Sequence, residues 1–182
     1  MADPDWSLVN RRLTEISDFL DGRRAEVYAV TEGIPAERLE RVPPGGGWTA
    51  AQVLEHLALA ESKTSQYLAA RLAKAIAAGL PREQEESSVL AAADGFPAVG
   101  PANAPEAVIP APGVAPSAAM ADLRASHEEM RALLRSADGW ALAAVQARHP
   151  LFGPMNMYQS LLFIGHHDRR HLPQITRAAA AG

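Results

Sequence analysis

The chain has 182 residues, 48% of them hydrophobic but only 5% aromatic, a mixture that suits packed helices better than a β-sandwich. Its length fits one domain, and a formal net charge of −4 without a basic block argues against nucleic-acid binding as its main task. Cysteine is absent, which excludes disulfides, thiolate metal ligands and a thiolate nucleophile from the protein.

The first predicted helix spans about residues 5–33. Asp3 or Asp5 is expected to cap its start. Arg23 and Arg24 interrupt its apolar stripe where one apolar residue is missing. The stripe itself recurs at steps of three, four and seven residues, as in an amphipathic helix: Val9, Leu13, Ile16, Leu20, Val27, Val30 and Ile34.

The second predicted helix follows a Gly/Pro loop at residues 43–47 and runs to about Gly79. Thr49, followed three residues later by Gln52, predicts a capping box at its start. His56 lies one turn further in, beside the apolar stripe. That stripe comprises Val53, Leu57, Ala60, Thr64, Leu68 and Leu72.

Residues 80–116 have a different composition, with Pro, Ala and Gly predominating. We expect a long, mostly irregular crossover, with a short helical turn near residues 82–90. A tether between helices is the simpler reading of this segment, and a lid over a pocket is the alternative.

The third predicted helix spans about residues 117–137 and is closed by residues 138–139. Residues 140–148 are expected to be irregular or partly helical, residues 149–154 form a turn, and Pro154 suits the first turn of the last helix. The core stripe of the third helix comprises Met120, Leu123, His127, Met130 and Leu134.

The last predicted helix ends in an Ala-rich tail that is expected to fray. Pro173 lies inside it and clashes with the carbonyl of Arg169, which predicts a kink or an early termination. Four helical patterns without a strand pattern predict an all-α four-helix bundle, as a single domain over residues 1–182. The long connection at residues 80–116 predicts a crossover that makes the second and third helices parallel.

Two histidines on the last predicted helix are candidate metal ligands. His167 and His171 are four residues apart, so both rings can face one ion, whereas His166 lies well round the helix from His171. His56 is the candidate third ligand if the second and last helices are neighbours. Three imidazoles suit a divalent metal ion and leave one position for water or substrate, the arrangement of catalytic sites.

Two blocks of sequence resemble the DinB/YfiT-like four-helix proteins. Residues 47–57 are similar to the family's Trp-Ser/Thr opening of the second helix with its first histidine. Residues 149–154 and 167–175 are similar to its last helix, with a His-x-x-x-His pair followed by Gln. The resemblance implies a divalent metal, with zinc or nickel first and iron or manganese as alternatives, on His56, His167 and His171. It also implies relatedness to thiol-dependent S-transferases and isomerases.

For the remaining polar residues, a structural role is the simpler interpretation, and a role at the metal site is the alternative. His127 is expected to be a core histidine or to support a ligand, His149 a turn residue bonded to backbone, and His166 a packed residue beside the pair. Asp168 is expected to be a solvated charge, with hydrogen bonding to a ligand ring as the alternative. Gln174 either bonds to the helix end or holds a ligand ring. Two satisfied histidines at a helix interface remain the alternative to a metal pair.

The prediction is a metal-dependent enzyme in which a low-molecular-weight thiol or water attacks a small electrophilic substrate, as in an S-transferase or a hydrolase. The catalytic residues stay unassigned, with Glu55, Glu61 and Asp168 as candidate bases only. The alternative is a non-catalytic metal-binding module or a homodimeric structural or sensing module. Without a signal sequence or a spanning apolar run, a cytoplasmic protein that binds neither membrane nor nucleic acid is expected.

Overall fold

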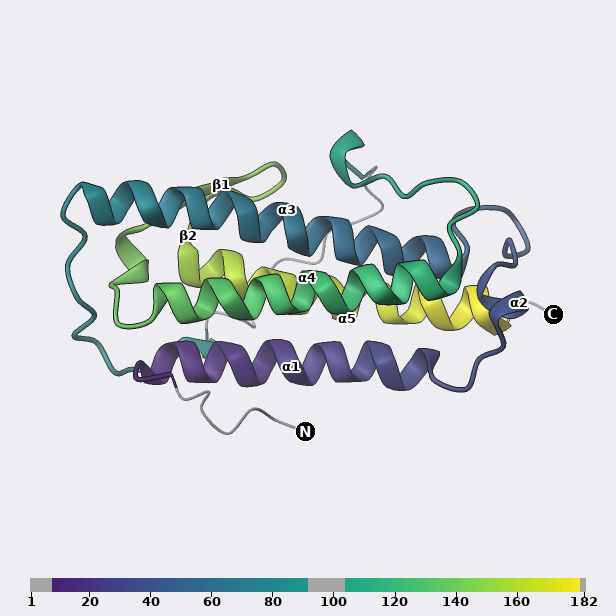
Figure 1. The fold of residues 1–182 in the computed structure, drawn as a ribbon, viewed down its shortest axis with the longest axis horizontal. Coiled ribbons are helices and arrows are strands. Elements are labelled where there is room, and N and C mark those ends of the chain that lie inside the picture. The colour runs from purple at the N-terminus through teal and green to yellow at the C-terminus, as the bar shows by residue number, and fades with distance from the viewer. Residues whose placement is uncertain (1–7, 92–103, 181–182) are drawn as a thin grey trace.

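The computed structural model describes residues 8–91 and 104–180. Figure 1 shows a bundle of long helices lying side by side, which confirms the predicted all-α four-helix fold. The four long helices are α1 (Arg11–Thr31), α3 (Ala50–Ala77), α4 (Pro116–Ala137) and α5 (Met157–Ala180). Among the described residues, no helix combines the length and the apolar character needed to cross a bilayer.

Capping explains where the helices begin. The capping box of Thr49 and Gln52 is present at the start of α3, as predicted. The side chain of Asn10 caps α1 by accepting hydrogen bonds from the first-turn backbone, so α1 begins later than predicted. Asp3 and Asp5, the expected caps, lie outside the described residues.

A short β-hairpin precedes α5 where the sequence predicted a turn and the first turn of a helix. Strand β1 (Gln146–His149) pairs antiparallel with β2 (Gly153–Asn156), and Pro154 stands opposite Arg148 in this two-stranded sheet. The helical placement of Pro154 is therefore wrong. Helix α5 begins after Asn156, whose side chain and backbone exchange hydrogen bonds of 2.9 and 2.8 Å with Gln159 in a second capping box.

Helix α5 also continues through Pro173 to Ala180, so the expected early termination is wrong. Ile175, Ala178 and Ala179 beyond the proline are buried against other helices. Burial of this apolar face offsets the missing backbone hydrogen bond.

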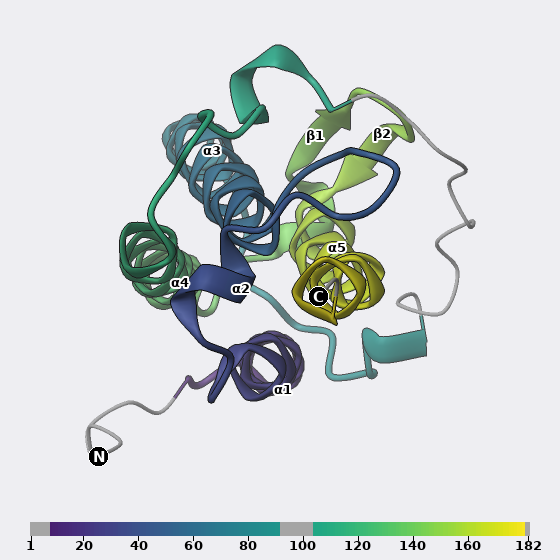
Figure 2. The ribbon, with the colours of Figure 1, turned by 90° about the vertical axis from the view of Figure 1, so that its right-hand side faces the viewer.

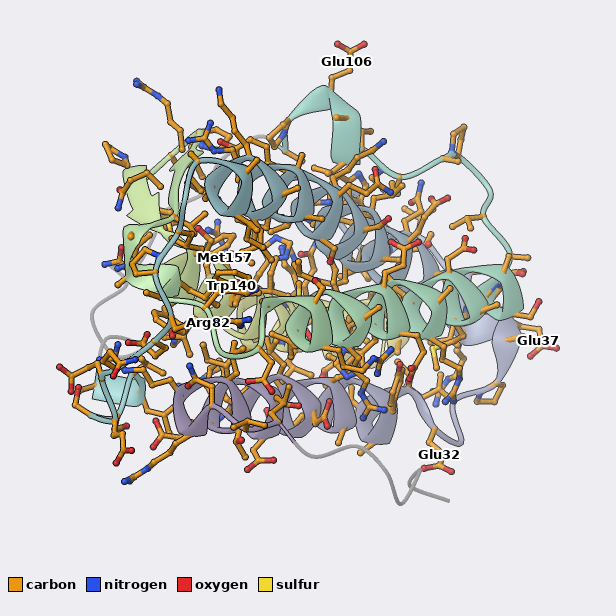
Figure 3. All side chains as sticks on the ribbon, turned by 60° about the vertical axis from the view of Figure 1, so that its left-hand side comes forward. Glu32, Glu37, Arg82, Glu106, Trp140 and Met157 are labelled. Atoms are coloured by element: carbon orange, nitrogen blue, oxygen red, sulfur yellow. The ribbon has the colours of Figure 1, made fainter. Side chains whose placement is uncertain are left out.

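The crossover between α3 and α4 makes these two helices run parallel, as predicted. Ser126 bonds to Glu61, and four residues further along both helices Ser65 contacts Met130. Beyond the helix ends, the guanidinium of Arg82 stacks 3.9 Å from the ring centre of Trp140 (Figure 3).

The remaining short elements lie at the ends and sides of the bundle. Figure 2 looks along the bundle and shows the hairpin over the side formed by α3 and α5. These elements are α2 (Ala36–Leu39), η2 (Glu106–Val108) and η3 (Leu142–Ala144). The crossover contributes to the bundle at both described ends, because Ser87 accepts a hydrogen bond from Arg12 and η2 lies against α3.

Two apolar clusters form the core, one towards each end of the bundle. The first includes Leu13, Leu68, Met130 and Leu161, and the second includes Val27, Leu54, Leu123 and Ile175. Buried polar side chains lie on the helix turns between these clusters. We call this set the polar layer, and it comprises Arg24, Glu61, Ser126, His127 and Asp168.

Candidate metal centre

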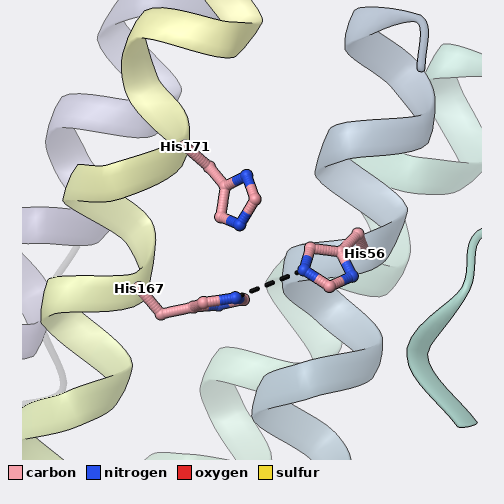
Figure 4. A group of neighbouring side chains, drawn as sticks. All are labelled: His56, His167 and His171. Carbon is pink, nitrogen blue, oxygen red and sulfur yellow. Dashed lines mark hydrogen bonds between the residues drawn. The ribbon is translucent and has the colours of Figure 1, made fainter. Parts of the chain in front are cut away.

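Two neighbouring helices bring three histidines together. His56 lies in the second turn of α3, and His167 and His171 lie one turn apart on α5. Figure 4 shows the three rings facing one another across the space between these helices. One nitrogen atom from each ring lies within 4.8 Å of the other two, and His56 Nε2 is 3.2 Å from His167 Nε2. The structure thus assembles the three residues that the sequence singled out.

Hydrogen bonds on the outer side of two rings orient their inner nitrogens. His56 Nδ1 donates to the backbone carbonyl of Val108 at 2.7 Å, and His171 Nδ1 donates to Oε1 of Gln174 at 2.8 Å. A neutral imidazole has a single N–H, so Nε2 of each ring carries a lone pair. Gln174 therefore holds a candidate ligand ring. This is the second of the two roles that the sequence left open for it.

The spacing of the nitrogens fits a metal ion. The His56 lone pair faces His167 Nε2, and such a contact between nitrogens is favourable only with a proton or a cation between them. Two nitrogens at about 2.0–2.1 Å from a tetrahedral zinc ion lie about 3.3 Å apart. The observed 3.2 Å is close to that separation, so this cluster can hold a divalent metal ion.

The electrostatics keep the three rings neutral at pH 7. Burial, followed by the neighbouring histidines and Arg170, lowers the pKa of His167 well below 6.5. Burial lowers the pKa of His171 to about 4 and also lowers the pKa of His56, although the bond to Val108 opposes this. Neutral imidazole is the form that binds metal, so no proton has to be displaced.

The histidines open onto a pocket of about 1020 Å³ between α3, α5 and the hairpin. Its walls include the aromatic rings of Trp48, Phe152 and Phe163, and the Trp48 ring lies 4.9 Å from that of His56. The described part of the crossover lines it as well, through Ala104, Pro105 and Val108. The crossover therefore forms part of the pocket wall in addition to connecting α3 with α4.

None of the three candidate bases lines this pocket, and no Asp or Glu does so within the described parts of the chain. Glu55 accepts a hydrogen bond from the backbone of Ala111 at 2.6 Å, which directs its carboxylate away from the histidines. Glu61 and Asp168 belong to the polar layer. The sequence-based suggestion of a carboxylate base at this site finds no support in the geometry.

Asp168 is buried, with 2% of its surface exposed, so its prediction as a solvated charge is wrong. Its Oδ2 lies 3.1 Å from Arg24 Nε, while Arg24 Nη2 donates to Glu61 at 2.9 Å. The Nε contact has ion-pair distance but not hydrogen-bond alignment. Burial raises the pKa of Asp168 to about 7, against the opposing charge of Arg24. His167 and Asp168 thus face different sides of α5, about 100° apart around the helix axis, with His167 towards His56 and Asp168 towards Arg24.

The other histidines lie outside the metal cluster. His127 bonds to Glu61 at 3.1 Å and to Asp21 at 2.8 Å, which confirms its reading as a core histidine. His149 Nδ1 accepts hydrogen bonds from the backbone of the hairpin loop, as predicted for a turn residue, but its ring also lines the pocket. His166 packs 5.5 Å from the ring of Phe19 on α1.

Several residues of the site gave no usable signal in the sequence. Val108 contributes a backbone carbonyl from a position 52 residues away from His56, and no side-chain pattern reports such a contact. Lys63 and Arg148 line the pocket from α3 and from the hairpin. For the polar layer, the interruption of the apolar stripe at Arg24 was the available signal, because this arginine occupies a fully buried stripe position.

Comparison with known proteins places the chain among similar sequences. The family model described as the DinB superfamily matches residues 20–175, a span that contains all three histidines. An uncharacterized protein of Bacillus subtilis (strain 168), YuaE, is 28% identical over 153 residues, covering 84% of this chain and 90% of that protein. No solved structure matches the chain.

Proposed function

This chain belongs to the DinB superfamily, and from that premise we propose that it is a metal-dependent enzyme acting on small molecules, with His56, His167 and His171 as the metal ligands. Family membership and the cluster of three histidines fit a metal-binding protein. The observation that carries the catalytic proposal is that these histidines open onto a large pocket. A buried site closed by four protein ligands would suit a structural role instead.

The reaction we propose is attack by a low-molecular-weight thiol, or by water, on an electrophilic substrate. A divalent ion at the site would lower the pKa of a bound thiol or water, so that its anion is available at neutral pH. Gln174 and the Val108 carbonyl would orient two of the ligand rings. The aromatic walls, Trp48, Phe152 and Phe163, would hold an apolar part of the substrate and exclude water.

His149 has a distinct part in this proposal. Its Nδ1 accepts from the backbone N–H groups of Leu151 and Phe152, at 3.2 and 3.3 Å, so the proton of the neutral ring is on Nε2. Burial lowers the pKa of His149, which keeps the ring neutral. We propose that it donates a hydrogen bond to the substrate rather than accepting a proton from it.

Metal analysis tests the ligand assignment. The purified protein is expected to bind about one zinc or nickel ion per chain after loading and desalting, and His56→Ala, His167→Ala and His171→Ala are expected to lose most of it. His166→Ala is the matched control, because this neighbouring ring packs on Phe19 and does not line the pocket. Equal metal content in the wild type and in His167→Ala would reject the assignment.

Turnover separates an enzyme from a non-catalytic metal-binding module. Small thiols are screened with a model electrophile, using the metal-loaded protein, the chelated protein and His167→Ala. Product formation that requires the metal and His167 supports the enzyme. Stoichiometric metal binding without turnover, together with a large fall in Tm on chelation, supports the module.

A further inference from the structure

The hairpin end of the pocket carries positive charge. Lys63 on α3 and Arg148 on β1 both line it. Tyr67 lies one turn beyond Lys63 on α3, and its hydroxyl accepts a hydrogen bond from the Arg148 backbone at 3.2 Å, which holds the hairpin against this face of the helix. Two exposed cations from separate elements thus line the same cavity, and the bond to Tyr67 holds the strand that carries Arg148 one helical turn from Lys63.

No carboxylate of the described chain compensates these charges. The pocket lining includes Lys63, Arg148, Arg170 and Arg177 but no Asp or Glu among the described residues, and Lys63 and Arg148 form no ion pair with any of them. Arg177 lies in the last turn of α5, where the helix C-terminus stabilises a cation. Lys63, in the middle of α3, and Arg148, on a strand, have no such stabilisation.

The surroundings of this pair suit an amphipathic small molecule. Neutral hydrogen-bonding groups line the same pocket, namely the hydroxyls of Thr64 and Ser160, and His149 is nearby. The rings of Phe152 and Phe163 form an apolar wall, 5.4 Å apart between centroids. Lys63 is seven residues beyond His56 on α3, about 10 Å along the helix axis. A ligand of several bonds would therefore reach from the cations to the histidines.

We propose that this pocket binds a small organic carboxylate, with its acidic group at Lys63 and Arg148 and its apolar part against Phe152 and Phe163. The inference rests on the proposed function only for the reaction that the bound molecule undergoes, because binding of the anion requires no metal. The carboxylate belongs to the electrophilic substrate or to the thiol, and turnover with matched pairs of each, carboxylated and neutral, would distinguish the two sources.

Equilibrium binding to the metal-free protein tests the proposal. The probes are 3-phenylpropionate and its neutral amide, titrated by calorimetry at low ionic strength, and chelation removes direct binding of the acid to a metal. The acid is expected to bind about five to ten times more tightly than the amide, and this preference should shrink at high salt. Lys63→Ala/Arg148→Ala should abolish the preference while leaving amide binding unchanged.

A charge-matched variant provides the control. Lys74→Ala/Arg38→Ala removes two cations that do not line this pocket and should keep the preference for the acid. Equal affinity for acid and amide in the wild type, no binding of either probe at millimolar concentration, or an equal loss in both double variants would overturn the proposal. Metal content is measured on the same preparations. A protein that prefers the acid yet binds no metal would refute the proposed enzyme alone. A protein that binds metal yet does not prefer the acid would refute this inference alone.

Discussion

His171 Nδ1 lies 2.8 Å from Oε1 of Gln174, one turn further along α5, so a side chain outside the histidine cluster sets the tautomer of one candidate ligand. Gln174→Leu should lower zinc affinity by about 10- to 100-fold without changing the fold, since the ring loses its orienting acceptor. Competition with a chromogenic chelator measures this. Gln66→Leu, on an exposed position of α3, is the control and should bind zinc as the wild type does. A Gln174→Leu protein with wild-type affinity would show that the ring needs no partner.

Arg24 is buried, with 1% of its surface exposed, and lies between Glu61 and Asp168. Arg24→Met should lower the free energy of unfolding by about 3–5 kcal/mol, because Asp168 is left buried without its cation and Glu61 keeps only His127 as a partner that can carry positive charge. Urea denaturation measures the loss. Arg23→Ala, at the next residue, breaks only a partly exposed pair with Glu26 and should cost less than about 1 kcal/mol. Similar losses in both variants would contradict a structural role for the polar layer.

Stability should depend on pH through His127. Burial lowers the pKa of this imidazole, but hydrogen bonds to Asp21 and Glu61 outweigh that effect and raise the pKa above 6.5. The native state then holds a proton that the unfolded chain releases more easily. The stabilisation by His127 is therefore fully present below pH 6.5 and is lost as pH rises through the native pKa. The difference in unfolding free energy between the wild type and His127→Gln should accordingly shrink from pH 6 to pH 9.

For His149, the same measurement of unfolding free energy should show the opposite dependence on pH. Burial lowers its pKa below 6.5, so the unfolded chain binds the extra proton and the native state does not. In the metal-free protein, the difference between the wild type and His149→Gln should grow as pH rises from the native pKa towards 6.5 and should level off above it. If both variants followed the same trend, one of the two assigned protonation states would be wrong.

Gly165 of α5 faces the ring of Phe19 on α1. A Cβ atom there would overlap the ring of Phe19, whose Cδ1 would lie only 2.9 Å away. Gly165→Ala should therefore cost about 1–3 kcal/mol of unfolding free energy, and Phe19→Ala in the same chain should relieve the overlap. Gly22→Ala is the matched control. A Cβ at Gly22 of α1 meets nothing within 4 Å, so this change should stabilise by up to about 1 kcal/mol.

The elements that sequence reasoning located correctly are those specified by local chemistry. The capping box at Thr49 depends on residues three apart, and the pairing of His167 with His171 depends on the helix period alone. The parallel course of α3 and α4 followed from the length of the connection between them. All three features need no knowledge of distant contacts.

The misplaced elements depend on contacts that the sequence does not display. Strands β1 and β2 have four residues each, too few to show an alternating pattern, and Pro154 favoured a helix start there. The second capping box, Asn156 with Gln159, has the three-residue spacing of the first, but the prediction placed the helix start at Pro154 and did not use it. Asp168 could be recognised as buried only once Arg24 was placed opposite it on α1. Val9 was assigned to the core stripe, yet 91% of its surface is exposed because α1 begins after it.

The polar layer between the two apolar clusters has a consequence for how the helices align. Sliding one helix by a single turn, about 5.4 Å, would carry Arg24 or Glu61 into a cluster of leucines and strip it of its partner. Misregistered packings are thereby disfavoured, and the two helices that bear His56 and His167 are held at matching heights. The vertical offset between these rings is then set by ion pairing elsewhere in the bundle, before any ligand binds.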